Sequence, residues 1–199
     1  MKQTITACLM ILLATVFAAA LPTEAEAEIY EDTIRLHILA NSDSDEDQKM
    51  KLIIRDKLLA KYGEALRSAN NIEEARAEAE ELLRDMEEDI ELWISDMGCS
   101  YSARARICEE WYETREYEGF SMPAGRYLSL IIEIGEGVGA NWWCVMYPPL
   151  CLDVCCEDMP EDDALIDYSK EESRLIGSGK YNVKFKLLEL FSRAFSENG

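Results

Sequence analysis

The sequence contains a single histidine, His37, and half as many basic residues as acidic ones. With 20 Lys and Arg against 40 Asp and Glu, the formal net charge is −20. Such a charge repels phosphates, which argues against nucleic-acid binding, and it disfavours adsorption to anionic lipid headgroups. Of the 199 residues 48% are hydrophobic, which suffices for one globular domain with tails.

Beyond residue 21, the sequence lacks any apolar run long enough to span a bilayer. Residues 5–21 carry no charge and follow Lys2, as in the hydrophobic region of a signal peptide. Small residues offer two cleavage points, after 18–20 (AAA) or after 25–27 (AEA). An uncleaved membrane anchor is the alternative, because the run is close to the minimum length of a span. We therefore expect residues 1–27 to be a signal peptide or an N-terminal anchor.

The first half of the remaining chain predicts a strand and two helices. Apolar residues alternate over 33–40, as in a strand, and recur at helical spacing over about 44–67. A second helix is predicted to begin after Asn71, with Glu74 completing a capping box, and to end at Gly98. Because the connection is short, the two helices should form an antiparallel pair.

From Cys99 onward the apolar period changes to two. Strands are predicted over 101–108, 126–134 and 141–147, and the glycines of 135–139 predict a hairpin between the last two. The expected fold is α+β, with two antiparallel helices and a C-terminal helix on a small, mainly antiparallel sheet. The expected segments are a domain over 28–154, an acidic loop or partly disordered segment over 155–180, and an amphipathic C-terminal helix over 181–199 that packs on the domain.

Seven cysteines occur, one of them in the expected leader. Cys144 and Cys151 flank a Pro-Pro turn, which favours a disulfide between them in an exported chain. Zinc binding by these two with Cys155 and Cys156 is disfavoured, because adjacent cysteines chelate one ion poorly. The sequence leaves open the connectivity of Cys99, Cys108, Cys155 and Cys156.

Two further patterns suggest ligand sites that the sequence does not complete. An EF-hand loop beginning at Asp43 needs Gly at its sixth position and Glu at its twelfth, where this chain has Gln48 and Ile54. The glycines of 135–139 precede a strand, whereas a dinucleotide-binding loop precedes a helix. We therefore expect no metal and no cofactor.

An exported cysteine-dependent hydrolase is the alternative function from a different class. It would use Cys144 as the nucleophile, His37 as the base and Asn41 to orient the imidazole. A third possibility is an anchored envelope protein that binds partners without signalling. The segment 142–143 supports an interaction role, because successive tryptophans on a strand point to opposite faces and one of them must be covered by a helix, a loop or a partner.

Several segments resemble the stage II sporulation protein R family over about residues 32–153, with a weaker likeness near 183–190. Residues 34–44 (IRLHILANSDS) with 47–51 (DQKMK) are similar to its N-terminal signature, and 123–127 (PAGRY) to its central turn. Residues 135–151 (GEGVGANWWCVMYPPLC) resemble its second signature, and 183–187 (VKFKL) its C-terminal helix.

The resemblance implies a signalling protein without catalytic residues, and therefore not an enzyme. Such a protein is secreted across the forespore membrane into the intermembrane space between forespore and mother cell. There it activates a membrane-embedded aspartic protease through the extracytoplasmic part of that protease, which leads to processing of a pro-sigma factor. The protein is expected to contact a membrane only through its leader or through its receptor. We expect the partner-binding residues to be Asn141, Trp142, Trp143, Pro148 and Pro149, with Asn41, Ser42 and Asp43 close by.

Overall fold

The computed structural model describes residues 2–20, 24–117, 120–148, 172–173 and 176. The chain divides into two compact units. The sheet unit comprises Ile29–Glu110 and Arg126–Ser169, and the hairpin unit comprises Met1–Glu28, Trp111–Gly125 and Lys170–Gly199. As expected from the sequence, the fold is α+β, with several helices and a mixed, mainly antiparallel sheet.

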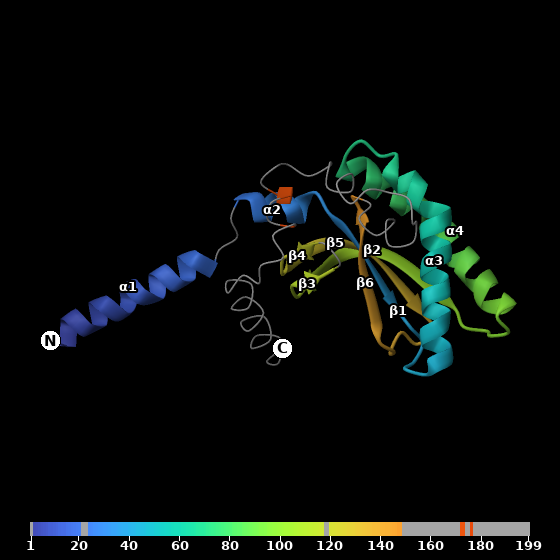
Figure 1. Cartoon of the computed structure of the whole chain (residues 1–199), viewed down its shortest axis with the longest axis horizontal. Helices are drawn as coiled ribbons and strands as arrows, with labels where there is room; N and C mark the ends of the chain where they lie inside the picture. Colours follow the sequence, from blue (N-terminus) through green and yellow to red (C-terminus); the bar gives the residue numbers. More distant parts are fainter. Residues whose placement is uncertain (1, 21–23, 118–119, 149–171, 174–175, 177–199) are drawn as a thin grey trace. The chain divides into compact units, whose positions relative to one another are not determined.

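The main sheet has four strands in the order β2-β5-β1-β6 (Figure 1). Their bounds are β1 Ile34–Leu39, β2 Ala103–Tyr112, β5 Gly125–Ile134 and β6 Asn141–Tyr147. Strand β1 runs parallel to β5 and antiparallel to β6. The predicted hairpin between β5 and β6 is therefore wrong, because β1 lies between them. Because β1 is buried, water cannot satisfy its backbone N–H and C=O groups, so the strand needs a hydrogen-bonded neighbour at each edge.

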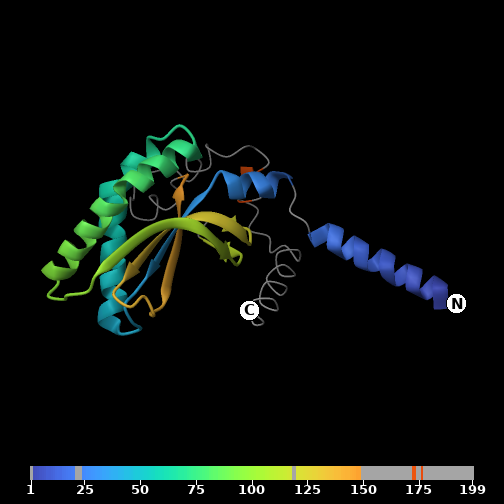
Figure 2. The ribbon, with the colours of Figure 1, turned by 180° about the vertical axis from the view of Figure 1, so that it is seen from behind.

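Two helices, α3 (Asp45–Arg67) and α4 (Ile72–Asp96), lie on the same side of the sheet in both views (Figures 1 and 2). Their predicted starts are confirmed: the side chains of Ser44 and Asn71 accept the hydrogen bonds that cap α3 and α4. The reciprocal bond of the capping box differs, because Glu74 accepts from the backbone N–H of Asn70 at 3.0 Å. The predicted end of α4 is also confirmed, with Gly98 at φ +82°.

The core lies between the helices and one face of β1, here called the helix face. Ile34, Leu36 and Ile38 on this face are fully buried. The helices bury Ile54, Leu58, Leu66, Met86, Ile90 and Ile94. Burial of each such side chain is worth about 1.5–3 kcal/mol. The opposite face of β1, here called the far face, carries Arg35 and His37, which are also buried.

The hairpin unit holds α1 (Lys2–Ala20), most of α2 (Glu24–Glu31) and a two-stranded sheet of β3 (Arg115–Glu116) and β4 (Ser121–Met122). Helix α1 forms where the sequence predicts a leader, and no helix of the described residues has the length and hydropathy to cross a membrane. The predicted acidic loop and C-terminal helix lie outside the described residues, apart from residues 172, 173 and 176, which are helical.

Candidate partner-binding site

Two loops interlock beyond the C-terminal end of β1. The 41–44 turn connects β1 to α3, and the 135–140 loop connects β5 to β6 by crossing over that turn. The N–H of Gly139 donates to the carbonyl of Ala40 at 2.9 Å. The two segments that the sequence singled out are therefore neighbours, and together they form one structural feature at the start of β6.

Side chains of the 41–44 turn hold the backbone of the 135–140 loop. The N–H of Glu136 donates to Asn41 Oδ1 at 3.0 Å, and the N–H of Ala140 donates to Asp43 Oδ1 at 2.6 Å. These bonds fix where β6 begins. Asn41 and Asp43, expected near a partner, thus have a structural role in this site.

The glycines of the 135–140 loop are explained by close approach to the 41–44 turn. A Cβ at Gly135 would lie 2.2 Å from Asn41 Oδ1, and a Cβ at Gly139 would lie 2.2 Å from the carbonyl oxygen of Ser42. Gly135 also has φ +60°, which side chains other than glycine rarely adopt. Loop interlocking, rather than phosphate binding, requires these residues.

Asp47 binds the 41–44 turn from the first turn of α3. Its Oδ2 accepts from Ser42 Oγ at 2.6 Å and from Asn41 Nδ2 at 2.9 Å, and its side chain is buried. The hydrogen bond from Ser42, followed by that from Asn41, lowers the pKa of Asp47 below its ordinary value, although burial opposes this shift. From the sequence, Asp47 stood out only as part of the 47–51 segment that resembles the N-terminal signature.

Lys51 fastens α3 to the 135–140 loop. Its buried ammonium donates to the carbonyl of Ala140 at 2.6 Å and to Gln48 Oε1 at 2.7 Å. Burial lowers the pKa of Lys51, while the nearby Asp43 carboxylate acts in the opposite direction. The acidic and basic residues of the first signature thus form hydrogen bonds within the protein.

Strand β6 presents the two tryptophans beside this feature. Trp142 lies opposite Ile38 and Trp143 opposite His37, so they belong to the helix face and the far face, respectively. The guanidinium of Arg55 lies 4.4 Å from the ring centre of Trp142. Both indoles are half-buried, at an edge strand of the sheet.

The far-face tryptophan is held by the single histidine. The rings of His37 and Trp143 are stacked, with centres 5.4 Å apart and an interplanar angle of 22°. Nδ1 of His37 lies 2.8 Å from Glu110 Oε2, so the carboxylate sets the orientation of the imidazole. Glu110 was not predicted as a site residue. It lies beyond the strand predicted over 101–108, and its contact with β1 across β5 could not be read from the sequence.

The structure does not bring Cys144, His37 and Asn41 together as a cysteine hydrolase would require. Cys144 is disulfide-bonded and lies opposite Leu36, whereas His37 projects from the other face of the sheet. Asn41, the expected orienting residue, binds Asp47 and the 135–140 loop. No free thiol is therefore available to the imidazole from Cys144.

The disulfide partner of Cys144 lies outside the described residues, so the pairing with Cys151 stays a prediction. Cys99 and Cys108 are free thiols. Pro148 is buried after a cis peptide bond, and Pro149 lies outside the described residues. The expected contact residues that remain at the surface of β6 are therefore Asn141, Trp142 and Trp143, all of them half-buried.

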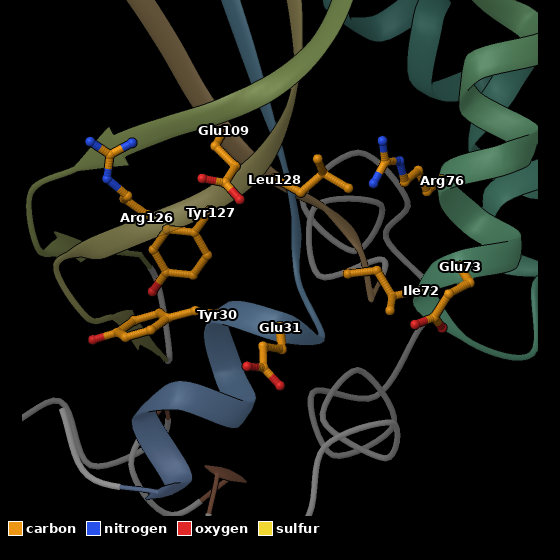
Figure 3. A pocket seen from close by; sticks show the side chains of 9 residues that line it. All are labelled: Tyr30, Glu31, Ile72, Glu73, Arg76, Glu109, Arg126, Tyr127 and Leu128. Carbon is orange, nitrogen blue, oxygen red and sulfur yellow. The ribbon is translucent and has the colours of Figure 1, made fainter.

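A separate pocket of about 280 Å³ lies in the sheet unit (Figure 3). Figure 3 shows the rings of Tyr30 and Tyr127 on one side, with Ile72 and Arg76 of α4 on the other. The centres of the two tyrosine rings are 5.1 Å apart, in an edge-to-face arrangement. The lining of the pocket includes carboxylates but neither histidine nor cysteine. Across the described residues, no group of three potential metal ligands occurs. This pocket therefore offers no pair of cysteine and histidine and, among the described residues, no cluster of metal ligands.

Two comparisons with known proteins indicate the same family. The model of a family described as Stage II sporulation protein R (spore_II_R) matches residues 30–156. The Stage II sporulation protein R of Bacillus subtilis (strain 168) is 36% identical over 160 residues, which cover 76% of this chain and 71% of that protein. No solved structure matches the chain.

Proposed function

This chain belongs to the stage II sporulation protein R family, and we propose that it is an exported signal that activates a membrane-embedded aspartic protease by contact. Activation leads to processing of a pro-sigma factor. The signal acts in the intermembrane space between forespore and mother cell, after secretion across the forespore membrane. The uncharged run of residues 5–21, which lies in and just beyond α1, supports export.

One observation carries the proposal: both signature segments hold the start of one edge strand. Residues of the 41–44 turn, the 135–140 loop and the first turns of α3 form hydrogen bonds with one another. What they position is a surface and not a catalytic group. A ligand activates a receptor by binding its active state more tightly than its inactive state, which requires only a rigid surface.

We name this surface the tryptophan edge and define it as Asn141, Trp142 and Trp143. Tryptophan is enriched among the residues that dominate binding energy at interfaces. In the described part of the chain, Nε1 of Trp142 and Oδ1 of Asn141 are shielded from solvent without a hydrogen-bond partner. Such groups destabilise a protein by about 1–3 kcal/mol each. A receptor gains affinity from them only if its binding exposes the two groups and supplies their hydrogen-bond partners.

Alanine substitutions at the tryptophan edge test the proposal. Trp142→Ala and Trp143→Ala should each reduce sigma-factor processing at least about thirtyfold, since truncating a dominant interface residue costs 2 kcal/mol or more. Export and folding should persist, as checked by the amount of exported protein and by circular dichroism. Leu92→Ala, at an exposed position of α4, is the control and should leave processing unchanged. Normal processing in both tryptophan variants would remove the proposed surface.

A further inference from the structure

The outer edge of β2, the edge strand opposite β6, is closed along only part of its length. The N–H groups of Ala103 and Ala105 donate to the carboxylates of Glu91 and Glu87, at 3.1 and 2.7 Å. These glutamates are one helical turn apart on α4. One turn before Glu87, the same side of α4 carries Leu83, whose side chain has no hydrogen-bond acceptor. The helix therefore caps the start of the edge and not its continuation.

The next outward-facing backbone groups are those of Ile107 and Glu109. Strand geometry places them on the same edge as Ala105, because alternate residues share an edge. Arg106 binds Glu133 and Glu110 binds His37, both on the far face, so the alternation is unbroken between them. Within the described residues, no hydrogen bond closes the outer edge at these two positions.

We propose that Ile107–Glu109 of β2, here called the open edge, pairs with an extended segment of a partner protein whose alternate residues are basic. Unpaired backbone groups of an edge strand are a ready template for an added strand. Resting on the proposed function, the inference places this segment in the extracytoplasmic part of the protease. The open edge and the tryptophan edge would then form two contacts on opposite edges of one sheet.

Charge selects the kind of partner. Helix α4, which flanks the edge, has eleven acidic and two basic residues, and Glu109 is exposed beside it. On the far face, Arg106 is paired with Glu133 at 2.9 Å. A strand added here meets the exposed carboxylate of Glu109, which lines one pocket with Glu73 and Arg76 of α4. The net negative charge of the chain then favours Lys or Arg at alternate residues of the partner. A second copy of this chain, with its charge of −20, would be repelled.

A proline substitution tests the pairing directly. Ile107→Pro removes an N–H that points away from the sheet, so the bonds between β2 and β5 are retained. Ile107→Val keeps the N–H and is the matched control. Glu109→Lys retains the backbone N–H groups and reverses the charge at an exposed position. It tests whether the open edge binds the partner even if the proline variant does not fold. Binding of each full-length variant to the purified extracytoplasmic part of the protease is measured by isothermal titration calorimetry.

The wild type and Ile107→Val should bind alike, while Ile107→Pro and Glu109→Lys each weaken binding at least tenfold. Wild-type affinity should also fall as salt is raised. If the wild type binds, and Glu109→Lys and folded Ile107→Pro bind with the same affinity, the proposed role of the open edge is wrong while the proposed function stands. Absence of wild-type binding would overturn both the open edge and the proposed function. If the wild type sediments as a dimer and Ile107→Pro does not, the partner of the open edge is a second copy of this chain, and the proposed basic partner is wrong.

Discussion

At the scale of single residues, the site depends on buried polar groups that bind each other. Asp47 joins the 41–44 turn to α3, and Lys51 joins α3 to the 135–140 loop. A buried hydrogen bond to a charged group contributes more than a neutral one, and removing one partner leaves the other unsatisfied. The tryptophan edge is consequently sensitive to residues that make no contact with a receptor.

Replacing Asp47 with Asn should lower the free energy of unfolding by about 1.5–3 kcal/mol at pH 7, because the charge-assisted bonds from Ser42 and Asn41 are lost. Urea denaturation measures this loss. Asp56→Asn, at an exposed position of the same helix, is the control and should stay within about 0.5 kcal/mol of wild type.

The loss of unfolding free energy caused by Asp47→Asn should depend on pH. The pKa of Asp47 is lowered by folding, so its stabilisation is present above the unfolded value of about 3.9 and is lost as pH falls through the folded value. The gap between wild type and Asp47→Asn should therefore narrow below about pH 4. A gap of equal size at pH 3 and pH 7 would contradict the proposed role of the carboxylate.

At the scale of elements, the crossing of the 135–140 loop over the 41–44 turn determines how β6 is held. Gly139→Ala brings a Cβ to 2.2 Å from the carbonyl oxygen of Ser42, so the backbone of one loop must move. We expect a loss of about 3 kcal/mol in the free energy of unfolding, at the upper end of the cost of overpacking because the clash is with backbone atoms. Thermal and urea denaturation measure this loss.

Gly98 and Val138 provide matched controls for that crossing. Gly98→Ala meets no atom within 4 Å, and its φ of +82° alone should cost about 1–2 kcal/mol. Val138→Ala, at an exposed position of the same loop as Gly139, should be nearly neutral. Equal losses in Gly139→Ala and Gly98→Ala would show that the crossing is less tight than the structure indicates.

Local signals were readable from the sequence, whereas pairings between distant segments were not. The starts of α3 and α4 could be predicted because a capping side chain, here Ser44 or Asn71, acts within three residues of itself. The position of β1 between β5 and β6 depends on contacts about a hundred residues apart, and adjacency along the chain favoured a hairpin instead. Likewise, nothing local indicated the pair of His37 and Glu110.

At the scale of the whole molecule, sequence identified the family before the fold was known. Its specificity came from strings such as 135–151, which the comparisons confirm as belonging to the stage II sporulation protein R family. The structure adds a reason for those strings: they build two interlocked loops and one edge strand. The negative charge of the chain, to which α4 contributes eleven acidic and two basic residues, agrees with the basic partner surface that we propose.

The central claim is that the chain activates its receptor by contact and not by chemistry. Its most direct test titrates the purified exported protein onto vesicles that contain the protease and the pro-sigma factor, and follows processing. The account predicts that processing reaches its maximum only when bound chains match protease molecules in number, and stops when the chain is washed away. Full processing by a small fraction of that amount, persisting after the chain is removed, would contradict it.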